Sequence, residues 1–145
     1  MVSTHTEQRH RTPVQAAALV VGAVFLLVGI LGFVPGITTN TDQLTLAGHH
    51  SEAMLLGIFQ VSVLHNAVHL IFGVAGILLA RAPMAAKRFL VVGGVVYLVL
   101  WVYGLVIGHD SPANFVPLNS ADNWLHFALG VAMMALGFVL SRKRA

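Results

Sequence analysis

Four long apolar segments constrain the fold of this chain more than any other feature. They cover about residues 13–34, 52–80, 89–108 and 123–140. A helix needs roughly 20 apolar residues to cross the ~30 Å hydrocarbon core of a bilayer, and each segment comes close to that length or exceeds it. Backbone N–H and C=O groups in lipid must form their hydrogen bonds within the protein. A single segment that crosses the membrane can do this only as a helix. The sequence therefore predicts an all-α integral membrane four-helix bundle.

The rest of the chain is too short for a second domain. We expect one transmembrane domain, residues 13–140, between short tails at 1–12 and 141–145. Only 9% of the residues are charged, whereas soluble domains carry about 25%. The chain contains no cysteine, which excludes disulfides, thiolate metal sites and a catalytic cysteine.

The basic residues alternate along the chain in a way that predicts the topology. They lie before the first helix, between the second and third, and after the fourth: Arg9, Arg11, Arg81, Lys87, Arg88, Arg142, Lys143 and Arg144. The other two loops hold Asp42, Asp110 and Asp122 instead. The positive-inside rule then places both termini in the cytoplasm and both long loops outside. The basic balance is a topology signal with affinity for lipid headgroups, and no nucleic-acid partner is expected.

Residues typical of helix ends flank the apolar segments. Thr12 before Pro13 predicts an N-cap followed by proline at the first helical position. Ser51 is the predicted cap of the second helix, with Glu52 favourable at the positive end of the helix dipole. Ser120 or Asp122 is the predicted cap of the fourth helix.

Polar and small residues share one face of the second and fourth helices. On the second helix, Ser62, Asn66, His69 and Gly73 follow helical spacing, with His65 beside them. The fourth helix has a matching stripe: Asn123, His126, Gly130, Met133 and Gly137. Such faces point into a membrane bundle. The polar groups fall in the outer half, and the inner half is apolar, so a pore through one chain is not expected.

One interpretation of this polar cluster is structural. Neutral histidine and asparagine side chains link transmembrane helices through hydrogen bonds worth roughly 1 kcal/mol each. In that case His65, Asn66 and His69 bond to a group on another helix or to a backbone carbonyl. The sequence offers Tyr103, Asn123 and His126 as such groups, with Asp122 nearby.

A second interpretation is a cofactor site. His65 and His69, four residues apart, can reach one ion, with His126 as a third ligand and Asp122 or Glu52 as a carboxylate partner. Zinc or copper would suit imidazole ligands. Haem b, held by one histidine of the second helix and His126, is a further alternative, since four-helix bundles house such groups. A pocket for a quinone or a lipid headgroup, formed by Trp101 and Tyr103, is another.

Two motifs resemble those of a known family. They are "VLHNAVHLIFGVAGILLAR" at residues 63–81 and "VPLNSADNWLHFALG" at residues 116–130. Together they resemble an uncharacterised family of four-span bacterial membrane proteins, common in actinobacteria, that carries a domain-of-unknown-function label. The resemblance implies a multi-pass bacterial plasma membrane protein and no particular activity. It marks these motif positions: His65, Asn66, His69, Asn119, Asp122, Asn123 and His126.

The sequence offers no nucleophile beside a base, no phosphate loop and no paired carboxylates, so nothing in it supports catalysis. We expect a non-enzymatic structural or accessory membrane protein. The alternative is a metal- or haem b-binding protein for electron transfer or sensing. The lipid bilayer is the expected partner, and the glycine-lined faces of the first and third helices allow a homo-oligomer or a larger complex.

Overall fold

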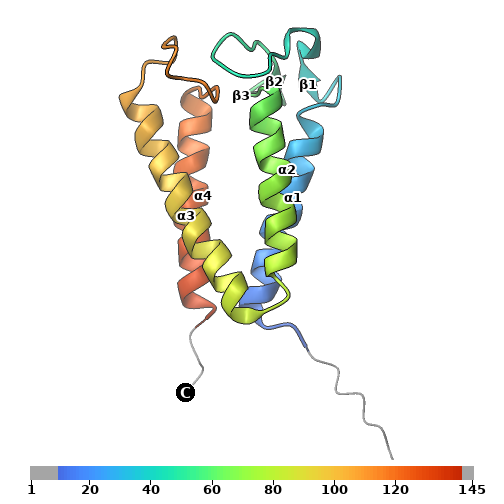
Figure 1. Cartoon of the computed structure of the whole chain (residues 1–145), viewed down its shortest axis with the longest axis vertical. Coiled ribbons are helices and arrows are strands. Elements are labelled where there is room, and N and C mark those ends of the chain that lie inside the picture. Colours follow the sequence, from blue (N-terminus) through green and yellow to red (C-terminus); the bar gives the residue numbers. More distant parts are fainter. Residues whose placement is uncertain (1–9, 142–145) are drawn as a thin grey trace, which may run out of the picture.

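The chain folds into four helices that run side by side, with both long loops at one end (Figure 1). The structure, a computed structural model, describes residues 10–141. The helices are α1 (Pro13–Leu31), α2 (Val63–Leu79), α3 (Pro83–Val106) and α4 (Ser120–Val139). The predicted all-α membrane bundle is confirmed. Arg9, Arg142, Lys143 and Arg144, with the outer parts of both expected tails, lie outside the described residues.

Three of the helices, α1, α3 and α4, are long and apolar enough to cross a membrane. The fourth, α2, is apolar but has only 17 residues. At ~1.5 Å per residue this gives about 26 Å, near the lower limit for a spanning helix. The chain is thus an integral membrane helical bundle with one short member.

The predicted start of the second helix at Glu52 is wrong. The loop before α2 instead forms a small antiparallel sheet of β1 (Thr38–Thr39), β2 (Met54–Leu55) and β3 (Phe59–Gln60), and the 3-10 turn η1 (Thr41–Gln43) precedes β2. Leu56 and Gly57 both adopt positive φ between β2 and β3. Helical backbone cannot continue through such a turn. Ala53, Leu55 and Val61 of this stretch are buried beneath the loop rather than in a helix, whereas Leu56 and Ile58 are exposed.

The helix caps also differ from the prediction in two of three cases. Thr12 does precede α1, and its backbone N–H donates to Gln15 Oε1 at 3.0 Å. The cap of α2 is Ser62, not Ser51, and the cap of α4 is Asn119, not Ser120 or Asp122. Ser51 instead donates to the Val61 carbonyl within the loop. In each case the residue that caps stands where the chain enters the helix in extended conformation.

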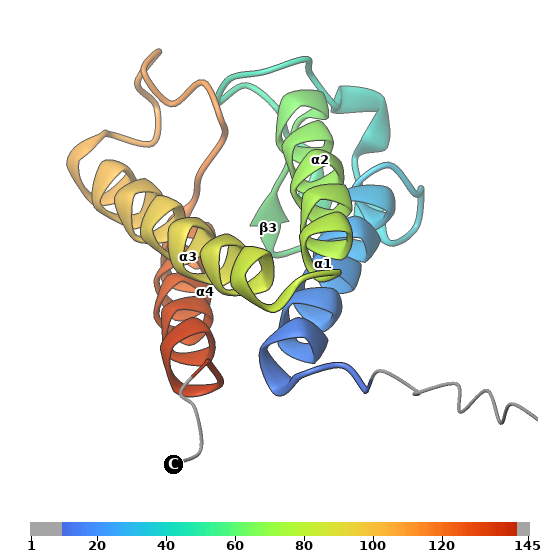
Figure 2. The same cartoon turned by 60° about the horizontal axis from the view of Figure 1, so that its bottom comes forward.

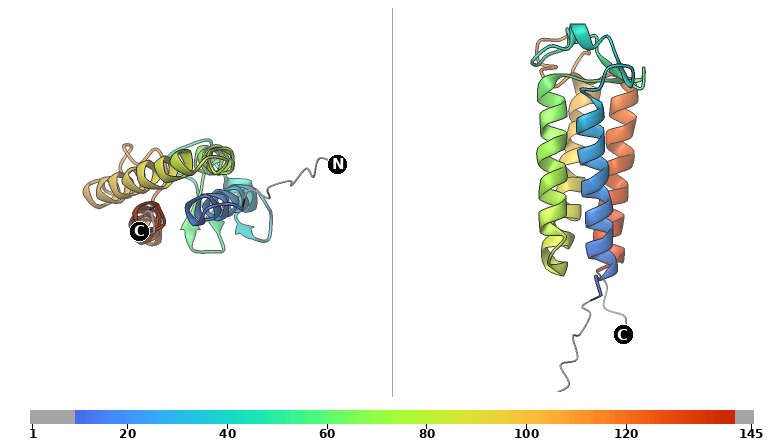
Figure 3. Two further views of the ribbon diagram at one scale, coloured as in Figure 1. Left: turned by 90° about the horizontal axis from the view of Figure 1, so that it is seen from below. Right: turned by 90° about the vertical axis from the view of Figure 1, so that its right-hand side faces the viewer.

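Glycines let the helices pack as two close pairs, α1 with α2 and α3 with α4, which Figures 2 and 3 show from two directions. A Cβ added at Gly22 of α1 would lie 2.9 Å from the carbonyl oxygen of Gly73 on α2. A Cβ at Gly94 of α3 would lie 2.8 Å from the Gly130 oxygen on α4. Small residues at such contacts allow helix backbones to approach closely. The van der Waals packing that results is one of the forces that hold helices together in lipid.

Aromatic side chains join the two pairs in the middle of the bundle. Phe25 of α1 lies 5.0 Å from Phe72 of α2 and 5.3 Å from Tyr97 of α3, between ring centroids. Phe72 also packs against Phe89 of α3 at 5.0 Å. Edge and offset contacts of this kind add roughly 0.5–1.5 kcal/mol each to the burial of the rings. This aromatic layer forms the floor of the polar cluster described next.

Candidate functional site

The predicted polar residues come together in the half of the bundle beneath the long loops. These are His65, Asn66 and His69 of α2 and Asp122, Asn123 and His126 of α4, and all six are at most 8% exposed. Four of them line one cavity, whereas Asn66 lies against Gly32 at the end of α1 and Asn123 against Gly104 of α3. The structure thus places every motif position of these two helices in one buried layer. We call these six residues the outer cluster.

The cap of α2 sets the position of its histidines. Ser62 Oγ accepts a hydrogen bond from the His65 backbone N–H at 3.1 Å. This bond fixes the first turn of α2 and places His65 in it, with His69 one turn further toward the middle of the membrane. Both rings then face the interior rather than lipid.

The imidazole rings belong to an aromatic stack that touches all four helices. The rings of His65 and His69 stack at 4.6 Å with 21° between their planes. The His69 ring also stacks on Phe25 of α1 at 5.5 Å, and the His126 ring meets the edge of Tyr97 on α3 at 5.1 Å. The three histidines are therefore packed like aromatic core residues.

This packing keeps the imidazole nitrogens from converging on one point. His65 and His126 lie 6.4 Å apart between ring centroids, and His69 Nδ1 is 3.0 Å from the carbonyl oxygen of His65 on its own helix. Within residues 10–141, no group of three or more His, Cys, Asp or Glu side chains is arranged to hold a metal ion. Glu52, the other predicted carboxylate partner, is exposed in the loop.

A cavity of about 100 Å³ lies between the histidines and the loop. His65, His69, Asp122 and His126 line it on the bundle side. The β2–β3 hairpin roofs it with Leu55, Leu56, Phe59 and Val61. The volume is enough for a few water molecules or an ion, because a water molecule occupies ~30 Å³ in the liquid. It is below the ~300 Å³ at which pockets for organic ligands begin.

Two imidazole nitrogens on these helices have no hydrogen-bond partner. They are Nδ1 of His65 and Nδ1 of His126, and both atoms are buried. Asn66 Nδ2 and Asn123 Oδ1 are also buried without a partner. An unpaired buried polar group costs roughly 1–3 kcal/mol, so a water or an ion in the cavity would satisfy the two imidazole nitrogens. Asn66 and Asn123 do not line that cavity.

Asp122 joins the fourth helix to the roof of the cavity. Its Oδ2 accepts from the Asn119 backbone N–H at 3.0 Å and from the Gln60 backbone N–H of β3 at 3.1 Å. The Asn119 side chain closes the cap by accepting from the Asp122 N–H at 2.9 Å and donates to the Ile58 carbonyl at 2.8 Å. The start of α4 therefore holds the hairpin in place.

Within residues 10–141, no hydrogen bond joins the side chain of His65, Asn66 or His69 to a side chain of another helix. The bonds that are present are different ones. Asn123 Nδ2 donates to the Gly104 carbonyl of α3 at 3.0 Å, which links α3 to α4. Tyr103, expected in the cluster, instead donates to the Ala113 carbonyl in the α3–α4 loop. The bond recorded for His69 runs within α2. Asn123 is thus the member of the outer cluster that bonds across two helices.

The hairpin and Gln60 are the parts of the site that sequence reasoning missed. Two short apolar pairs flank Gly57 in this stretch, a pattern typical of a hairpin. The high hydropathy of residues 52–62 hid that signal, because the same residues extend the apolar run of α2.

Fold and site together define a class: an α-helical integral membrane bundle whose buried polar cluster lies under a loop hairpin. The family model of the domain of unknown function DUF4383 matches residues 15–139 of the chain. The chain therefore belongs to this family, which confirms the resemblance to an uncharacterised family. No curated protein and no solved structure matches the chain.

Proposed function

We propose that the protein resides in a bacterial plasma membrane with both termini in the cytoplasm and both long loops outside. The charge distribution supports this orientation. Within the described chain, Arg11, Arg81, Lys87 and Arg88 all lie at the end where α1 begins and α4 ends. Asp42, Glu52, Asp110 and Asp122 all lie at the loop end. The positive-inside rule assigns the basic end to the cytoplasm.

Cysteine labelling tests the orientation directly, because the chain has no cysteine to remove. Ala113→Cys lies in the α3–α4 loop and Ala82→Cys in the α2–α3 turn, and both positions are exposed. In intact cells, a membrane-impermeant maleimide should label Ala113→Cys, and Ala82→Cys only after lysis. Labelling of Ala82→Cys alone in intact cells would reverse the proposed topology.

We infer a non-enzymatic structural or accessory role for the outer cluster. The observation that carries it is that Asp122 accepts backbone hydrogen bonds from Asn119, in the cap of α4, and from Gln60, in the loop hairpin. Polar groups of α4 are thereby part of the loop's support. On this proposal the histidines complete the packing of the bundle. His126→Asn should then keep most of the thermal stability in detergent, and the purified protein should contain no stoichiometric metal.

A second candidate function rests on the unpartnered Nδ1 atoms of His65 and His126 beside the cavity. A single transition metal ion, such as zinc or copper, would satisfy both once the two rings turned their nitrogens toward it. His69 would have to turn away from the His65 carbonyl to become the third ligand. The cavity volume of about 100 Å³ favours an ion over haem b, which needs a pocket of cofactor size.

Elemental analysis and an absorption spectrum of protein purified from its native membrane separate the two functions. One metal per chain, lost in His126→Asn but kept in His109→Asn, would establish the metal site. His109 is the matched control because it is exposed in the α3–α4 loop and does not line the cavity. A Soret band would identify haem b instead. A blank result on folded protein supports the structural role.

A further inference from the structure

The opposite end of the bundle contains a larger cavity that no part of the proposed function uses. It measures about 590 Å³ and lies between the start of α1 and the α2–α3 turn. Its lining includes His10, Arg11 and Arg81, and both arginines are exposed to solvent. This volume falls within the usual range for pockets that bind organic ligands, ~300–1,000 Å³.

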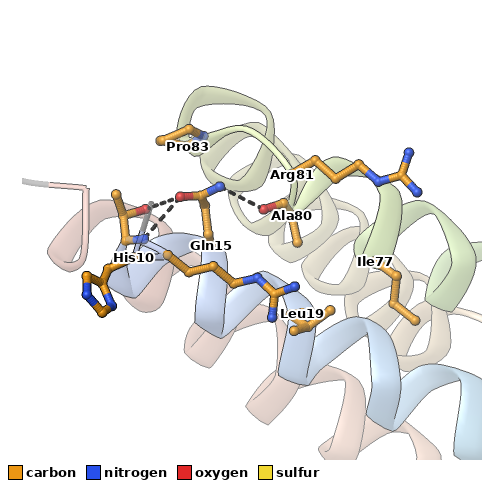
Figure 4. A pocket seen from close by; sticks show the side chains of 9 residues that line it. His10, Gln15, Leu19, Ile77, Ala80, Arg81 and Pro83 are labelled. Carbon is orange, nitrogen blue, oxygen red and sulfur yellow. Dashed lines mark hydrogen bonds between the residues drawn. The ribbon is translucent and has the colours of Figure 1, made fainter. Parts of the chain in front are cut away.

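A hydrogen-bonded support holds the wall of this cavity together. Figure 4 shows the Gln15 side chain donating to the Ala80 carbonyl at the end of α2, a bond of 3.0 Å. The Gln15 oxygen in turn accepts from the Thr12 hydroxyl at 3.0 Å. Gln15 is only 9% exposed. The start of α1, next to Arg11, and the end of α2, next to Arg81, are therefore fixed relative to one another before any ligand arrives.

The lining changes from charged to apolar with depth. Leu19 lies one helical turn, about 6 Å, deeper into the bundle than Gln15. Ile77 likewise precedes Arg81 by one turn along α2, and Figure 4 shows it near Leu19. A ligand that fills this cavity would meet cationic groups at the membrane boundary and hydrocarbon below them.

The surroundings of the cavity are also basic. A neighbouring cavity of about 300 Å³ shares Thr12 and Pro83 with the first and is lined by Lys87. In residues 10–141, the acidic side chains belong to the loop end. Basic pockets between helices at a membrane surface are typical binding sites for anionic headgroups.

We propose that the cavity lined by Arg11 and Arg81 binds an anionic phospholipid of the adjoining leaflet. The two guanidinium groups contact the headgroup phosphate, which suits their planar, bidentate geometry. Leu19 and Ile77 contact the first carbons of the acyl chains. A free phosphate ion would use the arginines alone, so the apolar depth of the cavity favours the lipid.

Lipid binding to the full chain in a neutral detergent tests this proposal. Phosphatidylglycerol, phosphatidylcholine and inorganic phosphate are titrated separately, with thermal stabilisation and native mass spectrometry as readouts. Phosphatidylglycerol should bind and raise the melting temperature, whereas phosphatidylcholine should do so weakly or not at all. Equal effects of both lipids would overturn the proposal. Stabilisation by inorganic phosphate alone would identify a free anion as the ligand and overturn it as well.

Substitutions assign the binding to this cavity. Arg81→Gln should weaken phosphatidylglycerol binding about fivefold, and Arg11→Gln/Arg81→Gln about 25-fold, because a basic residue near an anionic headgroup contributes about 1 kcal/mol. Arg81→Lys should retain part of the binding, since it keeps the charge but loses the bidentate contact.

Arg88→Gln is the matched control. Arg88 is an exposed arginine at the same end of the bundle that lines neither cavity. Its substitution should leave the affinity within about twofold of the wild type. An equal loss in Arg88→Gln and Arg81→Gln would mean that general surface charge attracts the lipid, and the cavity would not be the site.

Discussion

The two ends of the bundle differ in whether their polar side chains are buried or exposed. At the loop end, the polar side chains of the outer cluster are buried, and four of them line a cavity of about 100 Å³ beneath the hairpin. At the other end, arginines remain exposed around a cavity of about 590 Å³. The comparison shows how a chain with few charges places them. Positive groups stay at the water boundary, and the buried acidic group, Asp122, accepts two backbone hydrogen bonds.

The largest expected effect comes from disrupting the close packing of α1 against α2, which runs between the two ends of the bundle. A Cβ at Gly73 would lie 2.5 Å from the backbone nitrogen of Leu26, so Gly73→Leu should force α1 and α2 apart. We expect a loss of at least about 3 kcal/mol of stability, measured by thermal unfolding in detergent. Gly108→Ala is the control, because an added Cβ there meets nothing within 4 Å. A well-folded Gly73→Leu variant would contradict the close packing of this pair.

The next effect is confined to the loop end. Asp122→Ala removes both acceptor bonds that tie α4 to Asn119 and Gln60, which should cost about 1–3 kcal/mol. Hydrogen exchange at residues 54–61 should increase, while exchange at the α2–α3 turn stays unchanged. The exposed Asp110 provides the control Asp110→Ala. Similar exchange in the two variants would show that the hairpin does not depend on α4.

The corresponding change at the other end is smaller. Gln15→Ala removes the bond from α1 to the Ala80 carbonyl, worth about 1 kcal/mol. It also removes the two bonds that Gln15 accepts from Thr12, which lie within the first turn of α1. Its melting temperature should fall less than that of Asp122→Ala, and the exchange of the hairpin should not change. Gln43→Ala, at an exposed position of η1, should have no measurable effect. If Gln15→Ala lowered the melting temperature more than Asp122→Ala, the stronger stabilising contact would lie at the basic end of the bundle.

The smallest effect is expected from the exposed charges. Arg81→Gln should change the free energy of unfolding in neutral detergent by less than about 0.5 kcal/mol, as is usual for surface substitutions. Thermal unfolding without added lipid measures this. A destabilisation as large as that of Asp122→Ala would mean that the arginine is part of the fold rather than of its surface.

The parts of the fold that could be predicted from the sequence depend on local physics. Apolar length predicted the four helices, and helical spacing placed Asn66, His69 and His126 on inward faces. The start of the second helix could not be predicted from hydropathy, because Leu55 and Val61 are buried under a loop as fully as they would be in a helix. Burial is what hydropathy reports, and it does not distinguish the two conformations.

The helical residues of the candidate site could be predicted, but Gln60, the hairpin and the geometry could not. The positions of His65, His69 and His126 follow from helix periodicity and depth. Their ring orientations depend on contacts with Phe25 and Tyr97, residues of two other helices. The basic cavity likewise joins residues 10–19 to residues 77–83, which are far apart in the chain. Contacts of this kind leave no periodic signal in the sequence.

The pairing of α1 with α2 and of α3 with α4 has a consequence for biosynthesis. Each close pair consists of helices that follow one another along the chain. The glycine contacts of the first pair can therefore form while the ribosome is still making α3. The aromatic layer and the bonds from α4 to the hairpin come later, because they need residues from both halves. The roof over the histidines is thus secured only after the start of α4 has been made.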